Sequence, residues 1–194
     1  MNYRVLFAKR GFTIVELLIV IVVIAILAAI TIVAYNGTQQ RANNTAIIDA
    51  ASKSLRMIQA YVAVNGAYPL TSNGDACVTA ISGCLSDTGT TINASATFNS
   101  KIATVGSVPQ EIPSPGTLAY GIWVTYNTSQ TLNGVTQPLR LTYMLSGTAQ
   151  ACGLSGVVQY SWPNFVPATM GYTNGNTSST GKTLCWISVP GPSS

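Results

Sequence analysis

The longest apolar run of the chain lies near its N-terminus, from Phe12 to Ala34, and contains a single ionisable side chain, Glu16. A helix of this length, at about 1.5 Å per residue, can cross a hydrocarbon core about 30 Å thick. An acid within such a segment costs about 2.5–3.5 kcal/mol on insertion scales, which implies that Glu16 has a partner or a task. The pattern therefore predicts a membrane-spanning helix with one functional carboxylate.

After the apolar run, the pattern becomes that of an amphipathic helix. Apolar residues recur at spacings of three and four, at Ile48, Ala51, Leu55, Ile58 and Val62. No proline interrupts residues 12–65, so we expect one continuous helix with a weak point or bend at Asn36-Gly37, where glycine costs about 1 kcal/mol relative to alanine. Asn65-Gly66 and then Pro69 predict its end.

Further along the chain the period shortens to two, which is typical of strands. Alternation runs through residues 118–126 and 139–145, joined by a connection containing Asn133-Gly134, and further strands are expected near 157–160 and 184–189. Residues 70–117 lack sustained periodicity and are expected to be mostly irregular. Because neither a helix stripe nor a sheet can bury its apolar face alone, the prediction is an α+β fold: a long N-terminal helix packed on a C-terminal antiparallel sheet head.

The residues at the start of the apolar run resemble the N-terminus of type IV pilins and pseudopilins. The match is Lys9-Arg10-Gly11 followed by Phe12-Thr-Ile-Val-Glu16, and Asn65-Gly66-Ala-Tyr68-Pro69 resembles the helix exit of that family. The resemblance implies that a prepilin peptidase/methylase cleaves after Gly11 and methylates Phe12, and that Glu16 guides subunits into a fibre. The competing interpretations are an ordinary secretory signal, cut near Ala28, and a plain membrane anchor.

The resemblance also implies a division of the chain. Residues 1–11 form the leader, 12–35 the transmembrane half of the helix, 36–65 its amphipathic half, and 66–194 a globular head. By the positive-inside rule, the cations of the leader hold the N-terminus in the cytoplasm while the head is exported. The expected localisation is therefore a single pass through the cytoplasmic membrane, followed by an extracellular or periplasmic filament.

The formal charge of +4 suggests an acidic partner such as nucleic acid, but three of the nine cations lie in the leader. Removal of the leader leaves six cations against five acids, a charge of +1, and no dense basic patch. The sequence thus identifies no specific nucleic-acid site. The partners that the resemblance implies are copies of the chain, other pilins, the processing enzyme, the assembly platform and membrane lipid.

Four cysteines in an exported head indicate disulfides, and the sequence alone permits three pairings. We favour Cys77–Cys84, which closes a short loop, and Cys152–Cys185, which resembles the C-terminal disulfide of pilins. A zinc site is disfavoured because the chain has no histidine and no Cys-x2-Cys spacing.

Catalysis finds little support, because the chain has no histidine and its acids are scattered. We expect no enzyme activity, no cofactor and no metal. The favoured function is a structural subunit that polymerises through packed N-terminal helices. The alternative is a membrane-anchored binding module that never polymerises and recognises a ligand through exposed aromatic residues, with Trp162, Tyr172 and Trp186 as candidates.

Overall fold

The computed structural model describes residues 11–78, 83–86, 90–109, 121–132, 135–147, 150–154, 159–161, 166–167, 172–173 and 182–191. The chain divides into two compact units, Met1–Gln39 and Gln40–Ser194.

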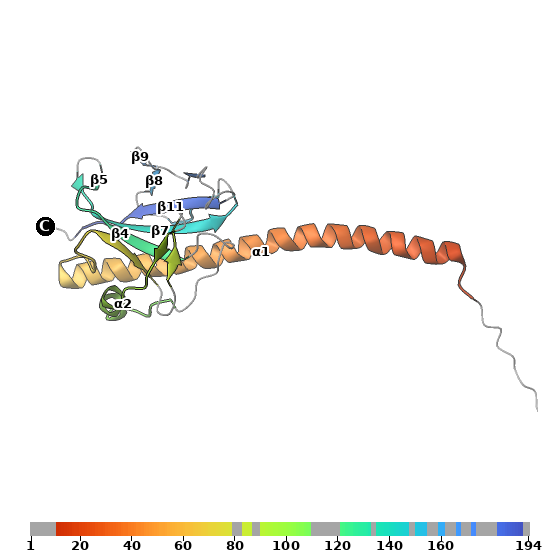
Figure 1. Ribbon diagram of the computed structural model, residues 1–194, viewed down its shortest axis with the longest axis horizontal. Coiled ribbons are helices and arrows are strands. Elements are labelled where there is room, and N and C mark those ends of the chain that lie inside the picture. Colours follow the sequence, from red (N-terminus) through yellow and green to blue (C-terminus); the bar gives the residue numbers. More distant parts are fainter. Residues whose placement is uncertain are drawn as a thin grey trace, which may run out of the picture. The chain divides into compact units, whose positions relative to one another are not determined.

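A single helix, α1 (Ile14–Asn65), begins in the first unit and ends in the second (Figure 1). Its helical conformation continues through Asn36-Gly37. The predicted end is confirmed: Gly66 adopts a left-handed φ of 62°, and its N–H donates to the carbonyl of Val62 at 2.9 Å. In the described part of the chain, α1 is the one helix whose length and composition would let it cross a membrane.

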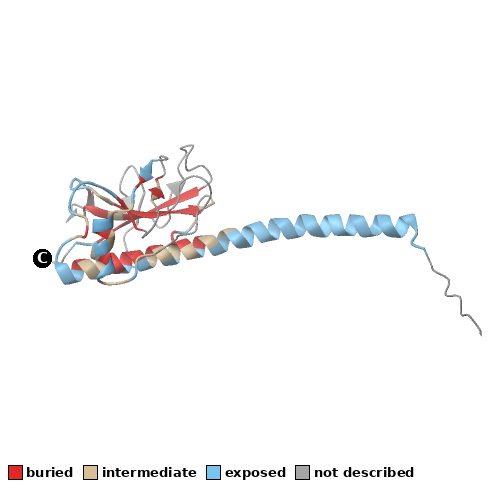
Figure 2. Ribbon diagram, turned by 60° about the horizontal axis from the view of Figure 1, so that its bottom comes forward, coloured by how far each residue is buried: buried red, intermediate tan, exposed pale blue. Residues whose placement is uncertain are grey.

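Within the first unit, every described residue from 11 to 39 is exposed, as the pale-blue ribbon in Figure 2 shows. These exposed side chains are mostly large and apolar, and an 18-residue window of the helix reaches a mean hydropathy of 3.4. Water solvates such a surface poorly, so this half of α1 needs a lipid or protein environment.

The second unit is built on an antiparallel sheet (Figure 1). Its strands, in spatial order, are β1 (Gly74–Cys77), β4 (Ile122–Tyr126), β7 (Leu139–Ser146), β11 (Lys182–Ser188), β8 (Gln159–Ser161) and β9 (Val166–Pro167), and β10 (Tyr172–Thr173) also pairs with β11. Two small two-stranded sheets join β2 (Cys84–Leu85) to β3 (Thr91–Ile92) and β5 (Thr131–Leu132) to β6 (Val135–Thr136). The predicted α+β class is confirmed, although positions 118–120 and 157–158 of the expected strands lie outside the described residues.

The expectation that residues 70–117 are mostly irregular did not foresee four short elements in the described part of this segment. This segment contains β1, β2, β3 and a short helix, α2 (Ala96–Ala103), which is capped at Ser95: the Ser95 hydroxyl oxygen accepts the Phe98 N–H at 3.2 Å. A strand of four residues and a helix of eight are too short to show a sustained period. They form because β1 pairs with β4 and because α2 buries Phe98 and Ile102.

Both faces of the main sheet carry buried side chains, and the buried strands appear red in Figure 2; the sequence predicted cover for one face, by the helix stripe. The face toward α1 forms the larger core, in which Ile47, Leu55 and Ile58 of the helix cluster with alternate residues of the strands, among them Val124, Leu141 and Ile187. The intervening residues of these strands form a second cluster, together with Cys84 and Ile92 of the small β2–β3 sheet. The strand residues of this cluster are Cys77, Trp123, Met144, Leu184 and Trp186.

The second cluster corrects one sequence-based expectation. Trp186, named as an exposed aromatic, is only 7% exposed, and the guanidinium of Arg140 lies 5.1 Å from the centre of its ring. The side chains of Trp162 and Tyr172 lie outside the described residues. Trp186 therefore contributes to the core of the head.

Candidate functional site

The helix start is fixed by a capping box between Thr13 and Glu16. Thr13 is the residue before α1, and Glu16 is the third residue of the helix. The Glu16 N–H donates to the Thr13 hydroxyl oxygen at 3.2 Å, and the Thr13 N–H donates to Glu16 Oε2 at 2.8 Å. These reciprocal bonds satisfy two N–H groups that an uncapped helix leaves unpaired. The carboxylate of Glu16 therefore has a local structural task.

The two residues before the capping box lie outside the helix. Gly11 and Phe12 are described but not helical, and the Phe12 side chain is 84% exposed. No heavy atom outside its chain neighbours lies within 4 Å of where a side chain on Gly11 would begin. The Gly11–Phe12 peptide bond is thus an accessible, non-helical bond just before a capped helix.

Thr13 is the residue of this capping box that the sequence interpretation missed. The signal is present as Thr13-Ile-Val-Glu16, a Thr-x-x-Glu pattern directly before an apolar run, which is typical of a helix N-terminus. The resemblance drew attention to Gly11, Phe12 and Glu16 but not to Thr13.

The capping box supplies no positive charge to Glu16 from the described residues. The Thr13 hydroxyl donates a further bond to Glu16 Oε2 at 2.7 Å, but both donors of Thr13 are neutral. Among the described residues no ion pair involves Glu16, and its neighbours Ile14 and Leu17 are exposed apolar side chains, 84% and 61% respectively. A cation brought to this position would therefore meet an uncompensated carboxylate.

The four cysteines form two disulfides, in the pairing favoured from the sequence. Cys77 of β1 is joined to Cys84 of β2, and Cys152 is joined to Cys185 of β11. All four are buried. The first bridge therefore holds a small sheet to the edge of the main one, and the second holds the segment after β7 to β11.

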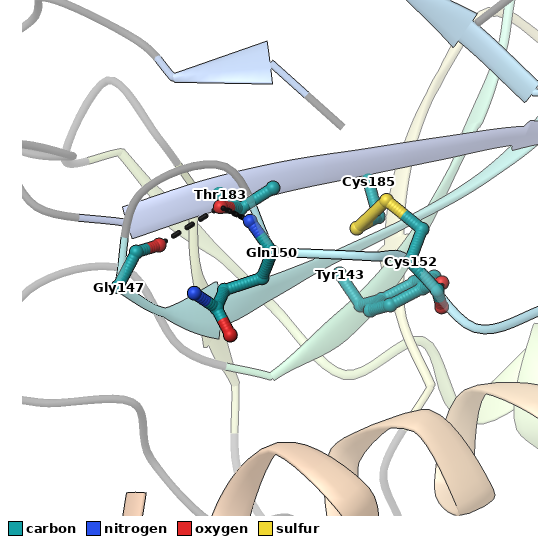
Figure 3. The surroundings of a disulfide bond; sticks show 6 residues. All are labelled: Tyr143, Gly147, Gln150, Cys152, Thr183 and Cys185. Carbon is teal, nitrogen blue, oxygen red and sulfur yellow. Dashed lines mark hydrogen bonds between the residues drawn. A yellow bond between two sulfur atoms is a disulfide. The ribbon is translucent and has the colours of Figure 1, made fainter. Parts of the chain in front are cut away.

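Tyr143 reinforces the second bridge (Figure 3). It lies opposite Cys185 in the β7–β11 pairing, and its hydroxyl donates to the carbonyl of Cys152. Burial raises the pKa of the Tyr143 phenol, because the apolar core disfavours the phenolate. The bridge and the hydrogen bond together tie Cys152 to two neighbouring strands.

We expect Tyr143→Phe to lower the free energy of unfolding by about 1 kcal/mol at neutral pH, because one buried hydrogen bond is lost. Because the pKa of Tyr143 is raised in the folded state, its contribution to the free energy of unfolding is fully present below the unfolded-state pKa of about 10. That contribution is lost as the pH rises above this value. The difference between the two proteins should therefore shrink above that pH. Urea unfolding of the full chain in detergent at neutral and alkaline pH, followed by tryptophan fluorescence, measures it; a pH-independent difference would contradict the assignment.

A pair of amide side chains fastens α1 to the end of β7. Asn44 accepts the Ser146 N–H at its Oδ1, at 2.8 Å, and donates from Nδ2 to the Ser146 carbonyl at 2.9 Å. Gln40, one turn earlier, donates to the same carbonyl at 2.8 Å. We call these three bonds the Ser146 clamp. The sequence analysis missed it, because an Asn and a Gln four residues apart gave no hint of a strand end far along the chain.

The described residues contain no group of three His, Cys, Asp or Glu side chains able to hold a metal ion. Asp75 lies exposed on β1 and accepts a hydrogen bond from the Thr125 hydroxyl.

Comparison with known proteins gives one match. Residues 6–32 fit the family model described as the prokaryotic N-terminal methylation motif, and this range includes Gly11, Phe12, Thr13 and Glu16. No curated protein and no solved structure was found to match the chain. Together with the apolar half of α1, the motif indicates membrane anchoring at the N-terminal end.

Proposed function

We propose that this type IV pilin-like protein, whose residues 6–32 carry the leader signature of type IV pilins and pseudopilins, is a structural subunit of a type IV pilus-like filament. The observation that carries the proposal is the methylation motif at the start of a long, uncovered apolar helix, whose first turn holds a carboxylate with no cation partner among the described residues. Copies of the chain packing their apolar helices together would remove that surface from lipid or water.

The proposal assigns a task to each part of the chain. Residues 1–11 are the cytoplasmic leader, 12–35 span the cytoplasmic membrane, 36–65 carry the head, and 66–194 form the exported head, which later lies outside the cell or in the periplasm. Tyr35, which is 67% exposed, stands at the end of the apolar run, where an amphipathic aromatic ring favours the membrane interface. The partners are further copies, other pilins, the peptidase/methylase and the assembly platform.

The geometry before the helix suits cleavage after Gly11. Proteolysis requires accessible backbone outside regular structure, and residues 11–13 have that character. Thr13 remains in the mature chain, so the capping box survives the cut and the helix keeps its first turn. Removal of the leader creates an amine at Phe12, four residues before Glu16.

That amine supplies the cation that Glu16 lacks. In hydrocarbon an amine and a carboxylate are each costly alone and far less so when paired. A four-residue spacing also permits contact within one chain. In a filament, however, the acid of a docked subunit attracts the amine of the incoming one and thereby sets the axial register. Apolar side chains such as Leu17 and Ile21 supply packing without a preferred register of their own.

We expect mass spectrometry of the membrane-extracted protein to find a mature chain that begins at methylated Phe12. Gly11→Val is the matched variant: its new side chain has open space in the described structure, so folding should be unaffected, while a branched residue beside the scissile bond should block cleavage. A wild-type chain still beginning at Met1, or one cut near Ala28, would contradict the proposal.

The binding-module alternative makes the opposite prediction for purified material. It requires a mature protein that stays a membrane-bound monomer, whereas a filament subunit is recovered in sheared extracellular or periplasmic fibres. With Trp186 buried, the alternative loses one of the three aromatic residues named for it. Immuno-electron microscopy of fibres with an antibody against the head decides between the two.

A further inference from the structure

Of the exposed charged side chains in the described part of the second unit, all but Asp75 lie on α1. Arg41, Asp49, Lys53 and Arg56 are all exposed along the helix, on the side that the sheet does not cover. We call these four residues the charged helix face. It carries three cations and one acid, with the acid between the cations.

The other cations of the mature chain are not available in this way. Lys101 donates from Nζ to the carbonyl of Pro69 at 3.0 Å, Arg140 lies over Trp186, and Lys182 is 8% exposed. In the part of the chain that the structure describes, the charged helix face therefore holds all the fully exposed cations that follow Gly11.

Within the described residues, the charges on this face form no ion pair. Asp49 and Lys53 stand four residues apart in the order that favours a pair along a helix, yet no ion pair between them occurs among the described residues. Such a pair stabilises a helix by only about 0.2–0.5 kcal/mol, so little is lost when either partner turns to another molecule.

We propose that the charged helix face is an interface with a second copy of this chain, in which Asp49 of the incoming subunit pairs with Lys53 of the docked subunit. The inference rests on the proposed filament. The sheet covers one side of residues 44–62 of α1, so other helices can approach only the uncovered side. The mixture of signs makes this face complementary to itself, which a purely basic face would not be.

The register follows from spacing along the helix. An offset of four residues, about 6 Å of helix, brings the Phe12 amine of the incoming subunit level with Glu16 of the docked one. The same offset in the same direction brings Asp49 of the incoming subunit level with Lys53. The two pairs, opposite in the order of their charges, thus select the same offset. At this offset the nearest cations are Lys53 of the incoming subunit and Arg56 of the docked one, which are one residue, about 1.5 Å, apart along the helix.

A neighbouring offset does not satisfy both pairs. Displacement by seven residues would bring Asp49 level with Arg56, but it would carry the Phe12 amine three residues beyond Glu16. Apolar contacts between the first halves of the helices distinguish poorly between these offsets. The charged helix face therefore acts as a second register determinant, outside the membrane, for the pairing proposed at Phe12.

Two charge reversals test the pairing. In a filament of Asp49→Lys alone, the new lysine of each incoming subunit faces Lys53 of the docked one. In a filament of Lys53→Glu alone, Asp49 of each incoming subunit faces the new glutamate of the docked one. Each variant expressed alone should lower the ratio of filament to membrane-pool protein by about tenfold, because like charges face each other at each subunit contact. When the two variants are expressed together, alternating copies restore opposite charges at every contact, and the ratio should return toward wild type.

Rescue by co-expression cannot come from a contact within one chain, because residues 49 and 53 of the same chain carry charges of the same sign in each variant. Lys and Glu are good helix formers, so α1 should keep its stability. Asp75→Lys, which reverses an exposed acid on β1, is the control of equal charge change and should assemble normally.

The inference is overturned if either variant alone assembles like wild type, if the mixture does no better than the single variants, or if Arg56→Glu rescues Asp49→Lys in place of Lys53→Glu. These outcomes differ from failure of the proposed function. If wild-type protein forms no filaments, the filament proposal itself is wrong; if it forms them and the reversals have no effect, only the charged helix face is excluded.

Discussion

Glu16→Gln is expected to assemble as poorly as Glu16→Ala, with a ratio of filament to membrane-pool protein lowered by at least about tenfold, the effect of losing 1.4 kcal/mol or more of pairing free energy. Glutamine keeps an oxygen that can accept the Thr13 N–H and so preserves the capping box, but it removes the charge. Alanine removes both. Equal defects would therefore assign the effect to the charge.

Thr13→Ala provides the matched control. It removes the capping hydroxyl and costs the helix about 1 kcal/mol at its start, but leaves the carboxylate of Glu16 intact. We expect this variant to assemble nearly as wild type does, and all three variants to be synthesised, inserted and cleaved. The measurement is made with each variant as sole subunit. Normal assembly of Glu16→Gln, combined with a defect in Thr13→Ala, would show that Glu16 acts only as a helix cap.

Removal of the Cys152–Cys185 bridge is expected to have the largest effect on the stability of the head. The bridge closes a separation of 33 residues, for which the chain-entropy model gives about 3.7 kcal/mol. The same model gives about 2.4 kcal/mol for Cys77–Cys84, with a separation of 7 residues. The alanine double variants compare the two bridges directly, since alanine places no polar atom in the core.

Urea unfolding of the full chain in detergent measures the two losses, with fluorescence of the buried Trp123 and Trp186 as the signal. The Cys152–Cys185 double variant should also lose the support that Tyr143 gives to the Cys152 carbonyl, which increases the difference. A larger loss from the Cys77–Cys84 double variant would mean that packing around the bridges outweighs the length of the loop they close.

The long helix could be predicted because its signals are local. An apolar run, a stripe at spacings of three and four, and Asn65-Gly66 all act within a few turns, and the helix ends where these residues place it. Its start was placed at Phe12 instead of Ile14, because the Thr13–Glu16 capping box was not considered.

The longer strands could be predicted for the same reason, but the small elements could not. β1 has only four residues, of which Gly74 and Asp75 are poor strand formers, and it exists because β4 offers a partner far along the chain. Trp186 was misplaced because alternation shows which residues share a face, not whether that face is covered. Long-range contacts decided both.

The residues of the candidate site likewise include some that could be predicted from the sequence and some that could not. Gly11, Phe12 and Glu16 were found through the resemblance, and Thr13 could have been found from its spacing to Glu16. The Ser146 clamp could not, because a side chain that binds the end of a strand leaves no periodic trace in the sequence.

The Ser146 clamp has a consequence for mechanical load. In the filament proposed above, tension along α1 would, in chain order, enter the second unit at Gln40 and Asn44, the two residues of the clamp. Three hydrogen bonds converge there on one peptide segment, so they share the load rather than break one after another. Because resistance to pulling is governed by the unfolding rate, the clamp places reinforcement where mechanical rupture of the head would begin.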